Sequence, residues 1–492
     1  MGLARRLRPL IALTAALVAV PTVAAVQPAR QIEETGYGSP NMRAVASDEY
    51  APLLEGRGGN AGTDLQFTDL LVDGELQNVA VTGSYYNGMH LFSLANPAAP
   101  ELLGVWSCGL AQGDIQVFVR DGRTYATFTR DTGYSLLGET ECALWAEENA
   151  EDAFMSSGGH GTFIADITDP TAPFTVSFVP FGKGSHNQTV HPSGNYLYNS
   201  NSELITSVTG EVGIEVTDIT DFANPVQVGF LPLPLRPGLG TESHDVTFNT
   251  QGTRAYSAAL SQTVVIDTTD PATPTVISSF MDPAINVEHQ SDPITLVDPI
   301  LGRREFLIIE DEFAGAVGTG QCPNGGVHVY DITGELEAAP VKVGYWNVSD
   351  IGPTNATLGG CTAHVFQLHE EEQLMTIAFY NGGVRVVDLS GLVGVALGAQ
   401  GVMGMREVAR YQFTDSNTWA VKAPWVDRDG KFWIYGNDQN RGFDTYEVDL
   451  SGAAPMSSTP GTWLTPQEVL ARALANPVDL TDYKPFCLLG DQ

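Results

Sequence analysis

Short runs in which apolar and polar residues alternate fill most of the chain, and the runs recur in a fixed order. One group reads GTFIADITDPTAPFTVSFV and begins at Gly161; another reads GIEVTDITDFANPVQVGFL and begins at Gly213. Alternation over four to eight residues rich in β-branched side chains predicts β-strands. The D-[IL]-[ST]-D-P-x-x-P segment between two runs predicts a turn, because Asp and Thr bond the local backbone and proline fixes φ.

This unit occurs seven times. An eroded first copy carries Ser93 where the other six carry an aspartate. The six aspartates are Asp166, Asp218, Asp267, Asp331, Asp388 and Asp449. A residue that recurs once per repeat usually has a repeated structural role, so we expect these aspartates to cap turns and not to be catalytic.

A further pair of strands precedes each unit. HNQTVHPSGNYLYNSN begins at His186 and HDVTFNTQGTRAYSAA begins at His244, each with a glycine where a hairpin would need one. One repeat is therefore four strands, which is a propeller blade. The sequence predicts an all-β fold, a seven-bladed β-propeller of four-stranded blades with a short C-terminal helical extension.

The ends of the chain indicate how the ring closes. Residues 42–46 (MRAVA) are similar to residues 405–409 (MREVA), the expected outer strand of blade six. No outer strand is evident after Asp449, so we expect the N-terminal segment to complete blade seven. Thr465, Pro466 and Glu468 form a capping box that predicts a helix to about Ala475.

The N-terminus indicates export. A basic stretch with Arg5 and Arg6, an apolar stretch and small residues up to Ala25 predict a signal peptide. We expect residues 1–25 to be this signal, 26–40 a linker, 41–463 the propeller, and 464–492 a C-terminal helix and tail. The protein is then periplasmic, secreted or on the cell surface, with no membrane span in the mature chain.

Charge and cysteines narrow the class further. The formal net charge of −34 argues against nucleic acid as a partner. An exported chain can form disulfides, and we expect Cys108 to pair with Cys142 and Cys322 with Cys361, because each pair brackets one blade insertion. The Glu-rich insertion at 136–159 is expected to form a lid or partner surface over one rim.

The repeats resemble the LVIVD-repeat family of exported bacterial and archaeal propeller proteins. The V-x-D-[IL]-[ST]-D-P-x-x-P segments carry this resemblance, which covers nearly all of the mature chain. The resemblance implies a propeller but no particular activity. The first functional hypothesis is therefore a monomeric module of the cell envelope that binds a protein, a glycan or a small molecule at a propeller rim.

A second hypothesis comes from one position that recurs at the start of the upstream strand pair. That position is occupied by Gln66, Asp114, His186, His244, His289, His364 and Lys422. In a propeller this position lies near the axis, so four imidazoles would converge. Such a site suits Fe, Cu or Zn and predicts a metal-dependent enzyme, an oxidoreductase in the first instance, with Asp114 as a further ligand or an orienting group. A structural role, in which each histidine bonds a neighbouring loop, stays open.

Acidic residues give two weaker hypotheses. Glu310, Asp311 and Glu312 end a strand at an insertion, where we expect a solvated acidic loop and, as the alternative, a Ca²⁺ site. A lactone hydrolase would need acidic metal ligands at the axis. Only Asp114 is expected there, so this reaction ranks last.

Overall fold

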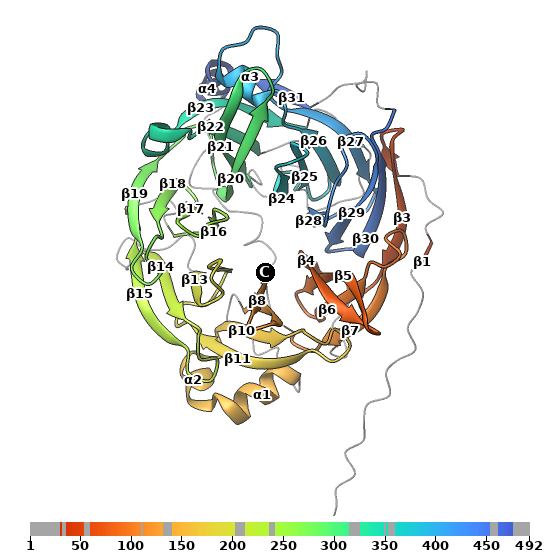
Figure 1. Ribbon diagram of the computed structural model, residues 1–492, viewed down its shortest axis with the longest axis vertical. Coiled ribbons are helices and arrows are strands. Elements are labelled where there is room, and N and C mark those ends of the chain that lie inside the picture. The colour runs from red at the N-terminus through yellow and green to blue at the C-terminus, as the bar shows by residue number, and fades with distance from the viewer. Residues whose placement is uncertain are drawn as a thin grey trace, which may run out of the picture.

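The fold is a ring of seven antiparallel sheets around a central axis (Figure 1). The computed structural model describes residues 30–31, 36–53, 60–109, 112–130, 140–201, 212–235, 242–313, 325–348, 351–352, 360–452 and 461–475. The predicted signal peptide lies outside these residues. The prediction of a seven-bladed propeller with four-stranded blades is confirmed.

Each blade runs outward from an innermost strand beside the axis. Blade one consists of β4 (Gly62–Val72), β5 (Glu75–Ser84), β6 (Gly88–Ser93) and β7 (Glu101–Trp106). Blade two consists of β8 (Gln112–Arg120), β9 (Arg123–Arg130), β10 (Gly161–Asp166) and β11 (Phe174–Pro180). Blade three consists of β12 (Asn187–Val190), β13 (Tyr196–Ser200), β14 (Gly213–Asp218) and β15 (Val226–Pro232). Blades four and five are β16 (Asp245–Phe248), β17 (Arg254–Ala258), β18 (Thr263–Asp267) and β19 (Thr275–Phe280); and β20 (Glu288–Asp298), β21 (Gly302–Asp311), β22 (Gly326–Asp331) and β23 (Val341–Asn347). Blades six and seven are β24 (His364–His369), β25 (Leu374–Ala378), β26 (Val384–Asp388) and β27 (Arg406–Gln412); and β28 (Thr418–Lys422), β29 (Lys431–Asp438) and β30 (Gly442–Asp449), completed by β3 (Met42–Asp48).

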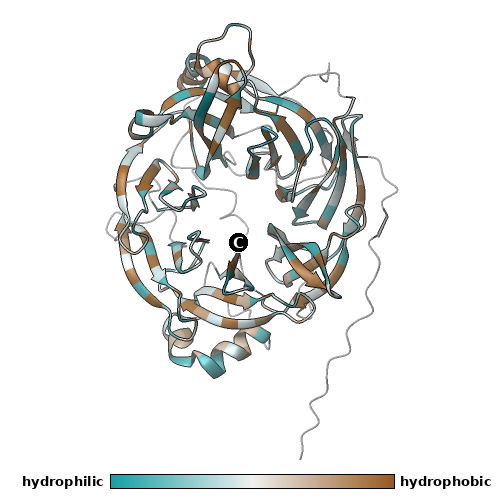
Figure 2. Cartoon of the chain, viewed as in Figure 1, coloured by the Kyte–Doolittle hydropathy of each residue, from teal (hydrophilic) through white to brown (hydrophobic). Residues whose placement is uncertain are grey.

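Neighbouring blades pack face to face, and the core lies between them. Val81 and Leu91 of blade one share a buried cluster with Phe128 and Phe163 of blade two. Hydrophobic and hydrophilic residues alternate along many strands in Figure 2. Side chains on both faces of a middle strand are buried between blades, which is why the polar alternation is weakest there.

The turn aspartates do the predicted structural job. In all six copies a carboxylate oxygen accepts a hydrogen bond from the backbone N–H two residues later, at 2.8–3.0 Å. In the eroded copy the hydroxyl of Ser93 accepts the same bond from Ala95, at 3.2 Å. The repeat therefore encodes one turn seven times, with serine as an adequate substitute.

The N-terminal segment closes the ring as expected. β3 pairs with β30, with Met42 opposite Val448 and Asp48 opposite Phe443. Part of the segment 26–40 is also strand: β1 (Arg30–Gln31) extends blade seven, and β2 (Tyr37–Gly38) extends blade six beside β27. Residues from opposite ends of the sequence thus hold two blades together.

The C-terminal helix is confirmed as α4 (Pro466–Ala475). The hydroxyl and backbone N–H of Thr465 both donate to a Glu468 carboxylate oxygen, at 2.7 and 2.8 Å. These contacts are the predicted capping box. The short strand β31 (Thr462–Leu464) pairs with β23, so this segment covers the outer edge of blade five.

The insertion expected to cover a rim lies elsewhere. Its described part forms α1 (Glu141–Asn149) and α2 (Glu151–Ser156), which pack beside β11 on the outside of blade two (Figure 1). Glu141 ties the insertion down, because one carboxylate oxygen accepts hydrogen bonds from the Trp106 indole and the Thr175 hydroxyl. The lid over a rim was therefore a wrong prediction for these helices; they cover an outer strand.

The predicted disulfide between Cys108 and Cys142 is present, with the Cα atoms 5.3 Å apart and both residues fully buried. It fastens α1 to the end of β7. Cys361 is also disulfide-bonded, but Cys322 lies outside the described residues, so the pairing of Cys322 with Cys361 stays a prediction.

Removing the Cys108–Cys142 bridge should lower stability markedly. The two cysteines are 34 residues apart, and closing a loop of that length in the unfolded chain stabilises the native state by about 3 to 4 kcal/mol. We expect the Cys108→Ser, Cys142→Ser double variant to unfold at a lower urea concentration than wild type. Equal midpoints would show that the helices hold without the bridge.

Candidate metal centre at the propeller hub

Four histidines occupy equivalent places at the inner ends of consecutive blades. His186 and His244 directly precede β12 and β16, His289 is the second residue of β20, and His364 begins β24. None is more than 3% exposed. The ring gives each blade's inner strand the same relation to the axis, and this repetition brings together residues 178 positions apart in the sequence.

The four imidazoles form a continuous row. Ring centroids are 4.3 Å apart for His186 and His244, 4.0 Å for His244 and His289, and 4.3 Å for His289 and His364. The Nε2 atoms of His186 and His244 are 2.8 Å apart. The sequence therefore named four residues that do lie side by side.

The His364 ring is held from behind through Nδ1, which donates to the backbone carbonyl of Trp419 at 2.5 Å. The Nδ1 atom of His289 lies 2.8 Å from a carboxyl oxygen of Glu310, without the geometry of a hydrogen bond. A neutral imidazole carries one proton, so a ring that uses Nδ1–H in this way has a lone pair on Nε2.

Those Nε2 atoms face a second buried carboxylate. Oxygens of Glu312 lie 3.6 Å from Nε2 of His364 and 4.0 Å from Nε2 of His289. The Tyr380 hydroxyl donates to Glu312 at 2.6 Å. His244, His289 and Glu312 each offer one potential ligand atom, and these atoms all lie within 4.8 Å of one another.

The expectation of a solvated acidic loop at 310–312 was wrong. Glu310 and Glu312 are fully buried, and Asp311 is 2% exposed. Burial raises the pKa of Glu310 well above its usual range, and the neighbouring Glu312 raises it further. Strand pairing could have predicted that these acids lie at the hub, because Gln290, next to His289, lies opposite Glu310 in the β20–β21 hairpin. Sequence analysis placed the acidic residues after a strand end and so missed their role at the hub.

Burial also favours the neutral form of three of these imidazoles, those of His244, His289 and His364. Desolvation lowers the pKa of His364 to about 3. It lowers the pKa of His244 and His289 well below the usual value, and neighbouring histidines lower both further. Neutral imidazole is the form that coordinates a metal ion.

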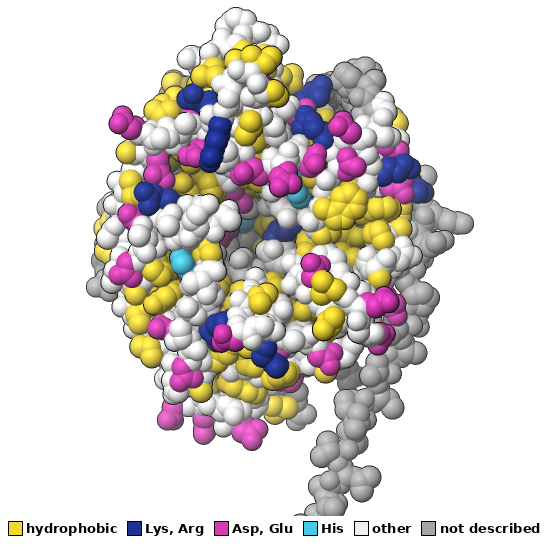
Figure 3. Space-filling model, in the orientation of Figure 1, with side chains coloured by type: hydrophobic (Ala, Val, Ile, Leu, Met, Phe, Trp, Pro, Cys, Tyr) yellow, Lys and Arg dark blue, Asp and Glu magenta, His cyan; other side chains and the backbone are white. Residues whose placement is uncertain are grey.

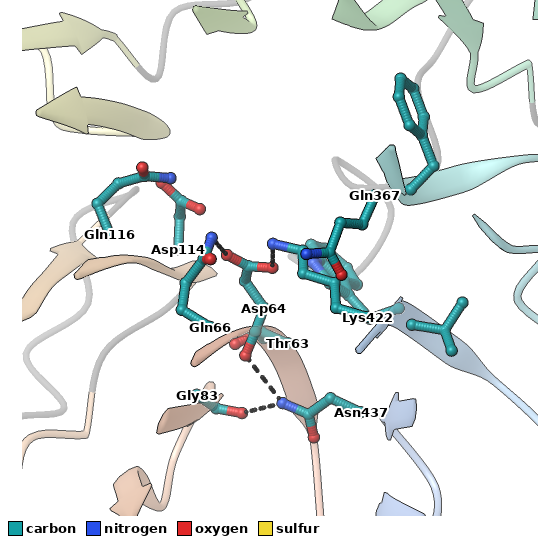
Figure 4. Close-up of polar contacts among 12 residues, drawn as sticks. Thr63, Asp64, Gln66, Gly83, Asp114, Gln116, Gln367, Lys422 and Asn437 are labelled. Carbon is teal, nitrogen blue, oxygen red and sulfur yellow. Dashed lines mark hydrogen bonds and ion pairs between the residues drawn. The ribbon is translucent and has the colours of Figure 1, made fainter. Parts of the chain in front are cut away.

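A polar chamber of about 800 Å³ adjoins the row of histidines, with His289 in its wall. Figure 3 shows this hollow at the centre of the ring. Asp114 lies in the chamber, where its carboxylate accepts hydrogen bonds from the backbone and side-chain nitrogens of Gln188, each at 3.2 Å. Lys422 lies there too and pairs with Asp64 at 2.6 Å (Figure 4).

The expectation that Asp114 is the only axial acid was also wrong. Asp64, Asp245 and Asp292 line the same chamber. Desolvation raises the pKa of Asp292 to about 6. Sequence analysis compared one position per blade, whereas these carboxyls come from positions nearby on the inner strands.

Losing the lysine of the Asp64–Lys422 pair should destabilise the ring. Both residues are less than 10% exposed, and the pair joins blade one to blade seven. Lys422→Met leaves the carboxylate buried without its cation, which costs about 3 to 5 kcal/mol. We expect much of the loss to be recovered in the Asp64→Asn, Lys422→Met double variant. Chemical denaturation measures both, and no loss in the single variant would contradict this role.

Fold and hub together define a class: a seven-bladed β-propeller with a buried histidine cluster beside an axial chamber. No protein-family model matches the chain, and no curated protein matches it. No helix in the described part of the chain is long and apolar enough to cross a membrane.

Solved propellers resemble the fold. Hydrazine synthase of Kuenenia stuttgartiensis is 11% identical, with 77% of this chain and 93% of that chain covered and a TM-score of 0.47. The β-propeller domain of Myceliophteria thermophila Cps50 (Swd1) is 10% identical, with 80% and 97% covered and a TM-score of 0.44. The periplasmic gluconolactonase PpgL of Pseudomonas aeruginosa is 11% identical, with 79% and 99% covered and a TM-score of 0.43. Likenesses at this level carry no argument about activity.

Proposed function

We propose that this chain is a metal-dependent enzyme, an oxidoreductase in the first instance, that holds one Fe, Cu or Zn ion at the propeller hub. His186, His244, His289 and His364 are the proposed ligands, with Glu312 as an additional ligand or an acceptor beside the ion. Imidazole suits these metals. Iron or copper would supply redox chemistry and zinc would supply Lewis-acid chemistry.

One observation carries the proposal: electron pairs face one another at the hub. The Trp419 carbonyl accepts from Nδ1 of His364, so the Nε2 lone pair of this ring points toward the Glu312 carboxylate at 3.6 Å. Nε2 of His289 lies 4.0 Å from the same carboxylate. Acceptors that converge in a buried site are unfavourable without a proton or a cation between them. A metal ion held here would satisfy the imidazole nitrogens and the carboxylate together.

The chain's own groups account for the rest of the site. The Trp419 carbonyl fixes the orientation of the His364 ring, as hydrogen-bond acceptors behind ligating histidines do in metal sites, and a Glu310 oxygen lies 2.8 Å from Nδ1 of His289. Tyr380 holds Glu312 by a hydrogen bond at 2.6 Å. The chamber brings substrate to the His289 side of the centre, and burial of the other rings excludes bulk water.

The sequence supports the wider setting of this proposal. The repeats favour membership of the LVIVD-repeat family, and the first 25 residues favour export to the periplasm, the exterior or the cell surface. The second candidate is a ligand-binding module of the cell envelope, and the polar chamber favours it, because such a space can bind a small molecule without any chemistry at the hub.

Metal analysis of protein exported and purified without an affinity tag distinguishes the two candidates. The enzyme proposal predicts about one Fe, Cu or Zn ion per chain by mass spectrometry of the elements. Protein that holds no stoichiometric transition metal, even after incubation with each ion and dialysis, would leave the binding module.

A further inference from the structure

Some residues line the chamber and also belong to the hub. His289 lines the chamber and also belongs to the row of imidazoles. Trp419 lines it as well, and its backbone carbonyl orients His364. A molecule in the chamber therefore lies beside the proposed centre. The volume of about 800 Å³ is within the ordinary range for small-molecule pockets.

Acidic side chains outnumber basic ones inside the chamber. Lys422 pairs with Asp64 at 2.6 Å (Figure 4). The hydrogen-bond donors to the other three carboxyls among the described residues are neutral groups. Desolvation raises the pKa of Asp114 well above its usual range and that of Asp245 to about 7, and a cation bound beside them would favour the ionised form. Asp114 accepts from Gln188, Asp245 accepts from the Val246 backbone, and Asp292 accepts from Thr247 and Gln290.

The arginines that line the chamber do not offset this excess of acidic side chains. Arg254 pairs with Asp267 and Glu337, and Arg303 pairs with Glu305. The arginines there are thus already matched by acids. A negatively charged ligand would meet uncompensated carboxyls further in, whereas an ammonium group would meet acceptors that lack a cation.

A second metal ion does not fit the chamber as well as an organic cation does. Within the described ranges, the hub is the one place where three His, Cys, Asp or Glu ligand atoms come within 4.8 Å of one another. The chamber carboxyls are too far apart for that test. They suit a ligand that spans them, with its charge separated from its other polar groups.

The remaining wall offers partners for hydroxyl groups. Gln66, Gln116, Asn187 and Thr189 line the chamber, and their amides and hydroxyl both donate and accept hydrogen bonds. The Trp419 side of the wall adds an aromatic residue, which can pack against a ring face. This mixture suits a compact molecule with several hydroxyls.

We propose that the chamber binds a small hydroxylated amine, of the size and polarity of an amino sugar, as the substrate of the hub centre. The part of this inference that makes the amine a substrate rests on the proposed enzyme function. The binding preference rests on the chamber alone. Asp114 accepts from the ammonium group, and the amide side chains select the hydroxyls.

Calorimetric titration of the full chain with three size-matched probes tests the preference. D-glucosamine and D-glucose share a pyranose ring and differ chiefly in charge, and D-gluconate is an open-chain anion of similar size. We expect glucosamine to bind about tenfold more tightly than glucose, and gluconate to bind most weakly, because one charge-assisted hydrogen bond in a partly buried site is worth about that factor. Glucose or gluconate binding as tightly as glucosamine, or no binding of any probe, would overturn the proposal.

A matched pair of variants locates the effect. Asp114→Asn keeps the shape and an acceptor for Gln188 but cannot ionise beside an ammonium group, so glucosamine binding should weaken about tenfold while glucose binding stays unchanged. Asp152→Asn, on the exposed helix α2, should change neither. Equal loss for glucosamine and glucose in Asp114→Asn would show a structural role and contradict the charge argument.

The same titrations separate this inference from the enzyme proposal. They are run on protein as purified and after removal of metal by a chelator. Selective glucosamine binding in protein that never holds a metal would contradict the enzyme proposal and support the proposed binding preference of the chamber. Metal-loaded protein without this preference would support the metal centre and contradict the proposed binding preference.

Discussion

Replacing His244 by alanine will abolish stoichiometric metal binding and leave the ring folded. His244 is in the middle of the row, with its ring centroid 4.3 Å from that of His186 and 4.0 Å from that of His289. Loss of an orienting group alone weakens a metal site 10- to 100-fold, and loss of a ligand should exceed that, so we expect the affinity to fall at least about 100-fold. Equilibrium dialysis with element analysis measures the change.

His191→Ala is the matched control. His191 is also buried in blade three, but its ring bonds Ser193 and the Gly252 carbonyl in the hairpin region, away from the row. This variant should lose stability and keep its metal. A His244→Ala protein that still holds one ion per chain with unchanged affinity would refute the proposed ligand set.

Deleting residues up to Asp48 will have the largest effect on stability. The deletion removes β3 and leaves β30 without its outer partner in blade seven. It also uncovers apolar surface, because Met42 and Ala46 are 5% and 1% exposed. We expect a fall in the unfolding temperature of at least about 10 °C, since each kcal/mol corresponds to about 2 to 4 °C in a large domain and the loss involves a whole strand.

The control for this deletion begins at residue 30 and keeps β1, β2 and β3. It should unfold at the temperature of the full chain, as followed by circular dichroism. If the longer deletion unfolds at that temperature too, ring closure by the N-terminal strand does not stabilise the fold.

Much of the architecture could be predicted because one local pattern repeats. Each turn aspartate makes the same contact with the backbone, so the seven blades can be counted from the sequence. The closing strand was predictable as well, because residues 42–46 resemble the outer strand of blade six and do the same job beside β30. These features depend on short-range chemistry and on repetition.

The hub was predictable only in part, for a physical reason. The four histidines occupy one repeated position, and repetition carries them to the axis. Glu310, Glu312 and Tyr380 come from second strands or from residues beyond strand ends, outside the one position per blade that was compared. Their approach to His289 and His364 depends on strand register and the length of the β20–β21 hairpin, which a one-position comparison does not contain.

The wrong predictions for the acidic residues 310–312 and for the helical insertion show a related limit of sequence analysis. Three acids in succession usually mark solvent, but in this chain they continue a strand into the hub and are buried. The 136–159 insertion is polar enough to lie over a rim or outside the ring. The hydrogen bonds that Trp106 and Thr175 donate to Glu141 hold its helices on the outside of the ring.

The most direct measurement is a crystal structure with anomalous diffraction data collected at the absorption edge of the bound metal. The account predicts one peak at the hub, about 2.0–2.2 Å from the Nε2 atoms of the coordinating histidines, with His364 still held through Nδ1 by the Trp419 carbonyl. A hub without a peak in protein shown to contain metal, or a peak elsewhere on the ring, would contradict it.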